Sequence, residues 1–226
     1  MYYFNTLVAW GPSIISGVWV TVSLALATLP LGLAMGFFIA LAKQSEEPTL
    51  RIAGNIYTTI FRGMPELLTL FIVFYGVQLG VQMLIPGFDV NAFAAGMVAL
   101  AFVFSSYASE VFLSAFRAIP KGQYEGGYAI GLSHGQTMRM VILPQLVRIA
   151  LPGLSNLWLI LLKDTALVSA VQLSDIMRQS TIASRVTKEP FLFFSVACML
   201  YLILSIISSY GIGVIERKVG SSERGR

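Results

Sequence analysis

The sequence predicts an all-α membrane protein with about five transmembrane helices. Hydrophobic residues make up 56% of the 226 residues and charged residues only 12%, whereas about a quarter of an average soluble protein is charged. The charges are gathered between apolar runs, and about 20 helical residues are enough to cross a hydrocarbon core roughly 30 Å thick. A water-soluble globular domain is therefore excluded.

Five apolar runs have the length of a membrane span. They cover residues 14–42, 67–84, 90–116, 140–162 and 191–215. The third run contains Glu110 and the fourth contains Arg148 and two prolines, so neither is purely apolar. Residues 165–174 are too few to span and are interpreted as a buried or re-entrant piece. Residues 220–226, rich in Ser, Gly and Arg, are expected to form a disordered tail.

The distribution of Lys and Arg predicts the orientation in the membrane. The segments after the first, third and fifth runs carry 11 of these cations, counting Arg148 near the start of the fourth run, whereas the segments on the other side carry 4. Because cytoplasmic loops hold the excess of Lys and Arg, the N-terminus is predicted outside and the C-terminus inside. The four outer cations all lie in residues 163–189, which indicates that this segment does more than connect two helices.

Residue counts disfavour several function classes. One Cys and one His cannot form an intramolecular disulfide or a His/Cys metal cluster. The net charge of +4 is spread between the apolar runs instead of lining one face, so nucleic acid is not an expected partner. No grouping of nucleophile, base and oxyanion donors is visible, and we expect no enzyme and assign no catalytic, cofactor-binding or metal-binding residue.

The loop between the third and fourth runs contains the most informative segment. Pro120 suits a helix start and Gly131 a helix stop, so residues 123–130 are predicted to form about two helical turns on the membrane surface. The small residues Gly126, Gly127 and Ala129 are expected to leave one side of this helix low in relief. The residues alone are consistent with an interfacial loop helix or with a projection that inserts into a partner.

The motifs of the chain resemble those of binding-protein-dependent ABC importer permeases. Glu125-Gly-Gly-x-x-x-Gly131 followed by Ile142-Leu-Pro144 is similar to the E-A-A-x-x-x-G and I-x-L-P elements of that family, with glycines replacing two alanines. Phe61-Arg-Gly-Met-Pro65 resembles the family's R-G-x-P. Further matches to its polar amino-acid branch lie at residues 107–110, 119–123 and 162–169. The resemblance is to permeases for histidine, for lysine/arginine/ornithine, and for octopine and nopaline.

This resemblance implies the type I ABC importer permease fold, with residues 1–226 as one permease domain and a cytoplasmic coupling loop at about 117–139. It also implies a multi-pass location in the bacterial inner membrane, and four kinds of partner besides lipid. These are a second, homologous permease chain, two cytoplasmic ATPase subunits, a periplasmic solute-binding protein and the substrate, an amino acid or opine. The most favoured substrates are basic amino acids or opines such as octopine and nopaline.

The resemblance also assigns the coupling residues. Those implied to contact the ATPases are Gln123, Tyr124, Glu125, Gly126, Gly127, Ala129, Gly131, Leu132 and Ser133. Glu125 could instead cap or salt-bridge within its own chain. The sequence contains no G-x-x-x-x-G-K-[ST] phosphate-binding loop, so the chain is expected to bind no cofactor, with ATP and Mg²⁺ held by the ATPase subunits.

Two polar residues of the third run are candidates for the substrate pathway. An ionisable group in a membrane span costs several kcal/mol unless it has a partner. Glu110 is therefore expected either to pair with Arg117, Arg62 or Arg148, or to contact the substrate or a gate. Tyr107, one turn earlier, could carry its hydroxyl to that carboxylate.

Two further pathway candidates lie on other runs. Asp164 sits beside Lys163, but adjacent helical residues diverge, which leaves the carboxylate free to meet an ammonium or guanidinium group. Gln78 either bonds to another helix or lines the pathway. The alternative function is that of an ion-coupled secondary transporter, which needs carboxylates at mid-membrane and usually internal repeats, and only Glu110 comes near this requirement.

Overall fold

The computed structural model describes residues 2–87 and 90–221, and this part of the chain contains helices and no strands. Five helical segments of it are long and apolar enough to cross a membrane: Tyr3–Gln44, Glu66–Leu84, Ala92–Ala118, His134–Val171 and Pro190–Lys218. The predicted all-α membrane fold and its five spans are confirmed. Most of the expected tail at 220–226 lies outside the described residues, and residues 220 and 221 continue the last helix.

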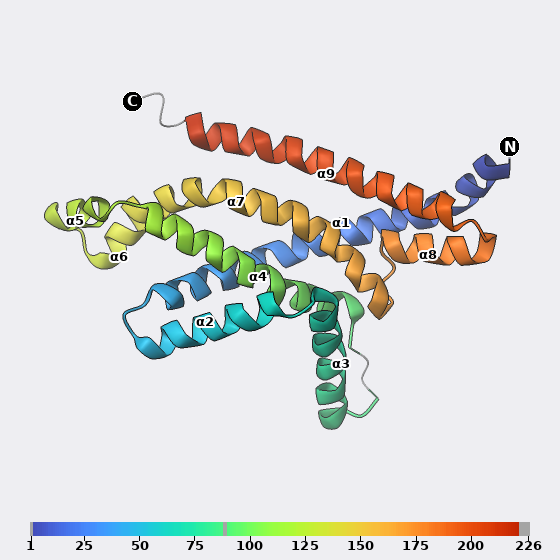
Figure 1. Ribbon diagram of the computed structural model, residues 1–226, viewed down its shortest axis with the longest axis horizontal. Coiled ribbons are helices and arrows are strands. Elements are labelled where there is room, and N and C mark those ends of the chain that lie inside the picture. The colour runs from blue at the N-terminus through green and yellow to red at the C-terminus, as the bar shows by residue number, and fades with distance from the viewer. Residues whose placement is uncertain (1, 88–89, 222–226) are drawn as a thin grey trace.

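The long helices run side by side, and the short ones lie mostly at the two ends (Figure 1). In chain order they are α1 (Tyr2–Gln44), α2 (Pro48–Gly63), α3 (Glu66–Leu84), α4 (Ala92–Ala118), α5 (Lys121–Ala129), α6 (His134–Thr137), the π-helix η1 (Met138–Ile142), α7 (Leu143–Asp164), the 3-10 helix η2 (Thr165–Val171), α8 (Ile176–Thr187) and α9 (Pro190–Ser221). Helices α5 and α6 lie at one end of the bundle and α8 at the other, while α3 points away from the long axis (Figure 1).

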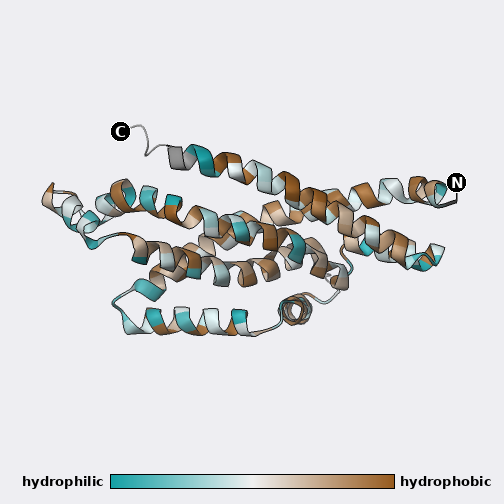
Figure 2. Cartoon of the chain, turned by 45° about the horizontal axis from the view of Figure 1, so that its top comes forward, coloured by the Kyte–Doolittle hydropathy of each residue, from teal (hydrophilic) through white to brown (hydrophobic). Residues whose placement is uncertain are grey.

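Two helices of the structure were not expected from the sequence. Residues 48–63 form α2 and residues 176–187 form α8. Both carry charges and are shorter than a span, so a search for charge-free runs of about 20 residues passes over them. Figure 2 shows hydrophobic residues along the middle of the long helices, whereas hydrophobic and hydrophilic residues alternate along α2. The short piece at 165–174 is interpreted correctly, because it forms η2 with three buried side chains.

Helices α1 and α4 are in direct backbone contact because α1 places glycines at the crossing. A Cβ atom at Gly36 would lie 2.8 Å from the Cβ of Ala108 and 3.0 Å from the carbonyl oxygen of Ser105. A Cβ at Gly32 would lie 2.6 Å from the ring of Phe104. Gly32 and Gly36 form a G-x-x-x-G pair, which allows helices to approach closely in a bilayer. The buried face of α4 thus becomes the centre of the bundle.

A buried carboxylate fixes α8 against α1 and α9. Asp175 is fully buried and caps α8, with its Oδ1 accepting a 2.9 Å hydrogen bond from the Arg178 N–H. Its Oδ2 accepts a 3.4 Å hydrogen bond from the Tyr201 hydroxyl of α9. The next N–H, of Ile176, donates to Thr21 Oγ1 of α1 at 3.4 Å. Burial raises the pKa of Asp175 to about 6, while the backbone N–H groups around it act in the opposite direction.

The tight crossing of α1 and α4 predicts that the same substitution destabilises the protein at one glycine and not at another. Gly36→Ala should lower the free energy of unfolding by about 1–3 kcal/mol, because the added methyl group overpacks a backbone contact. Gly211→Ala on α9 is the matched control, since a Cβ there meets no atom within 4 Å. Thermal unfolding of both variants in detergent checks this, and equal midpoints would show that the crossing tolerates a methyl group.

Candidate functional site

The predicted loop helix is present as α5. It begins at Lys121, two residues earlier than expected, because Pro120 occupies the N-cap. It ends before Gly131, whose φ of +84° lies in the left-handed region that glycine adopts without strain. The N–H of Leu132 closes the turn by donating to the Gly127 carbonyl at 3.1 Å. The start and stop residues therefore had the structural roles that the sequence suggested.

The low side expected of Gly126, Gly127 and Ala129 is present at Gly126 and Ala129, which are both exposed and lie three residues apart, but Gly127 is not part of it. Successive helical residues point in different directions, about 100° apart at 3.6 residues per turn. Gly127 is buried, and a Cβ there would lie 2.6 Å from Thr137 Cγ2, at the end of α6. Gly126 is exposed, and a Cβ there would meet nothing within 4 Å. Gly127 thus packs α5 onto its own chain, and Gly126 belongs to the free surface beside Glu125.

The segment after α5 is held by local bonds. Ser133 caps α6, and its backbone N–H donates to Gln136 Oε1 at 2.9 Å while its hydroxyl accepts from the Gln136 N–H at 3.3 Å. The π-helix η1 then continues into α7, as π-helical turns do at many functional sites. On α5, Gln123 Oε1 accepts a 3.0 Å bond from Gln145 of α7. Burial raises the pKa of the Tyr124 phenol, which therefore stays protonated at neutral pH.

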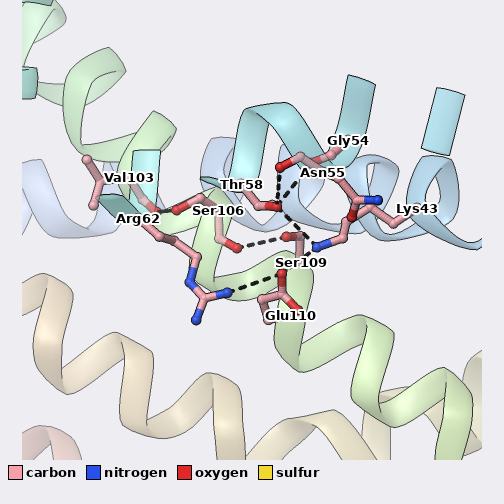
Figure 3. Close-up of polar contacts among 9 residues, drawn as sticks. All are labelled: Lys43, Gly54, Asn55, Thr58, Arg62, Val103, Ser106, Ser109 and Glu110. Carbon is pink, nitrogen blue, oxygen red and sulfur yellow. Dashed lines mark hydrogen bonds and ion pairs between the residues drawn. The ribbon is translucent and has the colours of Figure 1, made fainter. Parts of the chain in front are cut away.

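Three charged side chains meet where α1, α2 and α4 come together (Figure 3). Glu110 Oε1 forms an ion pair with Lys43 Nζ and a second one, at 3.2 Å, with Arg62 Nη1. Lys43 also donates to Thr58 Oγ1 at 3.1 Å. The side chain of Lys43 is only 6% exposed, whereas that of Glu110 is 33% and that of Arg62 45% exposed. This charge cluster supports the structural alternative for Glu110.

The cluster agrees with the sequence only in part. Arg62 was among the expected partners of Glu110, but Lys43 was not, because 67 positions separate it from Glu110 in the chain. Tyr107 contacts the cluster through its ring: the Arg62 guanidinium carbon lies 5.5 Å from the ring centroid, within the range of a cation–π contact.

Tyr107 also lines a small pocket that contains two carboxylates, which we call the acidic pocket. Glu66 of α3, Tyr107 of α4 and Asp164 of α7 line it together with apolar side chains, among them Phe104 and Leu161. Its volume is only about 20 Å³, which has room for about one water molecule. The structure thus brings Asp164 and Tyr107, two of the four pathway candidates, into one pocket, and Glu110 does not line it.

The structure favours the hydrogen-bonding alternative for Gln78 and adds Glu66, which the sequence analysis did not name. Gln78 lies outside the acidic pocket, and its Oε1 accepts a 2.7 Å hydrogen bond from the Val90 N–H, which ties α3 to the segment before α4. Glu66 was missed, although it lines the pocket. It stands at the first position of α3, next to an apolar run, where a charge looks like an ordinary flank of a span. Its only signal is that it follows the R-G-x-P motif directly.

The charge cluster makes a prediction about stability. Glu110→Gln should lower the free energy of unfolding by about 3 kcal/mol, the lower end for a broken buried pair, because Glu110 keeps some contact with water. Adding Lys43→Met to this variant should restore part of the loss, since no buried ammonium group is then left unpaired. Glu46→Gln, at an exposed position, is the control. Thermal unfolding in detergent measures these differences. Equal unfolding midpoints for Glu110→Gln and Glu46→Gln would contradict a stabilising role of the cluster.

Comparisons of sequence agree with this arrangement. The family model described as "Binding-protein-dependent transport system inner membrane component" matches residues 8–221. The chain is 37% identical over 227 residues to the arginine ABC transporter permease protein ArtQ of Escherichia coli (strain K12), covering 92% of this chain and 95% of ArtQ. It is 36% identical over 210 residues to the histidine/lysine/arginine/ornithine permease protein HisQ of Salmonella typhimurium, with coverages of 91% and 92%. It is 37% identical over 209 residues to the nopaline permease protein NocQ of Agrobacterium fabrum, covering 89% of each chain.

Solved structures agree as well. An amino acid ABC transporter crystallised with histidines aligns with a TM-score of 0.82 at 32% identity, covering 95% of this chain and 98% of that one. The MetNI methionine ABC transporter in an inward-facing form aligns with a TM-score of 0.78 at 18% identity, covering 92% and 96%, and shows the same fold. The motifs, the fold and the relatives lead to one conclusion: this chain belongs to the permease subunits of binding-protein-dependent ABC importers.

Proposed function

We propose that this chain forms half of the translocation pathway of an importer for cationic amino acids or opines. The observation that carries the proposal is the acidic pocket, where the carboxylates of Glu66 and Asp164 come from two helices to one place beside Tyr107. The names of the relatives support it, because ArtQ is named for arginine, HisQ for histidine, lysine, arginine and ornithine, and NocQ for nopaline.

The chemistry of the pocket favours a positive charge. A guanidinium or ammonium group between two carboxylates gains charge-assisted hydrogen bonds worth about 1.5–3 kcal/mol each, and an anionic group is repelled. Because the pocket is too small for an amino acid in this conformation, the proposal requires a second packing of the helices in which it opens.

Helix α5 is the proposed contact to the ATPase subunits. Its exposed face presents Glu125 and Gly126, while its other face is tied to α7 by the bond between Gln123 and Gln145 and to α6 by the contact of Gly127. Helix α4 ends only two residues before α5 begins. A displacement of α5 therefore acts on α4 and α7, which carry Tyr107 and Asp164 of the acidic pocket.

The remaining parts of the importer complete the proposal. ATP and Mg²⁺ bind to separate ATPase subunits at the α5 end, which faces the bacterial cytoplasm, and this chain binds no cofactor. A homologous permease chain forms the other half of the pathway in the inner membrane. The solute-binding protein approaches from the outside, at the end where α8 and the N-terminus lie (Figure 1).

A binding measurement tests the acidic pocket. Asp164→Asn should weaken arginine binding by the purified complex about tenfold or more, the loss of one charge-assisted hydrogen bond, while basal ATP hydrolysis stays unchanged. Glu66→Gln should act in the same direction. Equilibrium dialysis without the binding protein measures the affinity of the pathway itself. Glu189→Gln, between α8 and α9 and outside the acidic pocket, is the control. Unchanged arginine affinity in both pocket variants would contradict the proposal and would mean that another subunit determines the selectivity.

A second measurement tests the contact of α5. Glu125→Lys should lower the ATPase activity that loaded binding protein stimulates, without changing the thermal unfolding midpoint, because Glu125 is exposed and its charge faces the partner. Glu46→Lys introduces the same charge at another exposed position near the same end and should leave this activity intact. Full stimulation in Glu125→Lys would exclude this residue from coupling.

A further inference from the structure

An apolar groove between α1, α7 and α9 is separate from the acidic pocket. Its volume is about 330 Å³, and it is open toward the surface of the bundle. The lining includes Leu29 and Leu33 of α1, Leu151 and Trp158 of α7, and Ile212 and Ile215 of α9. All three helices contribute from segments that span the membrane. Helices α7 and α9 run beside each other in opposite directions (Figure 1).

The groove contains one polar atom that lacks a partner. The hydroxyl of Ser155 is buried and forms no hydrogen bond within the described part of the chain. Ser155 lines the groove between Leu151 and Trp158. A buried hydroxyl without a hydrogen bond costs free energy, so this atom favours an occupant that brings an acceptor.

Cationic side chains stand at one end of the groove. Arg148 lies three residues before Leu151 on α7, and Lys218 lies three residues after Ile215 on α9, so each shares a face with its neighbour in the groove. Because α7 and α9 run in opposite directions, both cations lie beyond the same end, the one near α5 (Figure 1). Glu216 adds one carboxylate there, and the net charge of the three groups is +1.

We propose that this groove binds an anionic phospholipid. One acyl chain fills the apolar part, the phosphate lies near Arg148 and Lys218, and an ester carbonyl accepts a hydrogen bond from Ser155. The groove holds part of an acyl chain, because its volume of about 330 Å³ is more than twice the about 150 Å³ that takes up benzene, and its open side lets the rest of the chain lie in the bilayer. Basic groups between membrane helices near the cytoplasmic face are suited to anionic lipid headgroups. A free amino acid, which is polar at every end, does not fit this lining.

The bound lipid has a structural consequence. Only 11% of the apolar window of α9 is buried within the described part of the chain, as little as for α3. An acyl chain between α9 and the pair α1 and α7 supplies the packing that protein side chains do not supply there. The site thereby links the position of α9 to the lipid composition of the membrane.

Tryptophan fluorescence provides the test, because Trp158 lines the groove. The chain has three tryptophans, so Trp10→Phe with Trp19→Phe leaves Trp158 as the single reporter. The full chain is reconstituted into phosphatidylcholine vesicles that contain brominated phosphatidylglycerol or brominated phosphatidylcholine as quencher. Half-maximal quenching should require an about fivefold lower mole fraction of brominated phosphatidylglycerol than of brominated phosphatidylcholine. This is the preference expected for one net positive charge near the phosphate.

Variants separate the two parts of the site. Arg148→Gln with Lys218→Gln should remove the preference for phosphatidylglycerol, whereas Arg185→Gln with Lys188→Gln at the opposite end should retain it. Leu29→Phe, which fills the groove, should reduce quenching by both lipids, and Leu202→Phe on the exposed face of α9 should not. Equal quenching by both lipids in the parent chain would mean ordinary bilayer contact and would overturn the proposal. Absence of quenching by either lipid would also overturn it, because protein would then cover the groove.

Discussion

The carboxylate of Glu110 is the interaction on which the rest of the arrangement depends. A charge inside a membrane span is tolerated only with a partner, and Glu110 has two, from the ends of α1 and α2. The pairing sets α1 and α2 against α4 and places the guanidinium of Arg62 over Tyr107. Through Tyr107, this cluster adjoins the acidic pocket without contributing its own carboxylate to it. We propose that the cluster positions these helices and that the carboxylates of Glu66 and Asp164 bind the substrate.

Two helices, α4 and α7, connect the acidic pocket with the end of the bundle where α5 lies. Helix α4 carries Tyr107 in its middle and leads into α5, and α7 carries Asp164 at its far end and begins just after η1. Close contacts made by glycines join these helices to their neighbours, so that displacement at α5 is not absorbed by loose side chains. An importer of this family needs such a connection between the end where ATP acts and the place where substrate passes. The comparisons support this family and offer no support for the ion-coupled alternative.

Local signals explain what could be predicted. The spans follow from hydropathy because a helix that crosses a bilayer must be long and apolar. Helix α5 follows from Pro120 and Gly131, each of which acts on the turn of chain next to it. Asp164 was selected because it follows Lys163 directly, and adjacent helical residues diverge, so that lysine need not neutralise the carboxylate. Helices α2 and α8 were missed because amphipathic segments of 16 and 12 residues do not show the length of a span. Glu66 was missed because its position at a helix start resembles that of any flanking charge.

The sequence by itself determined the class of the protein, the number of spans and the motif that places it in its family, because each depends on composition or on residues close together in the chain. Only the tertiary structure decided which charges meet. Lys43 reaches Glu110 and Glu66 joins Asp164 because helices distant in sequence pack side by side, and that packing depends on glycines whose importance appears only at a crossing. It also decided that Gly127 faces inward while Gly126 faces outward, since a helix turns each residue away from its neighbour.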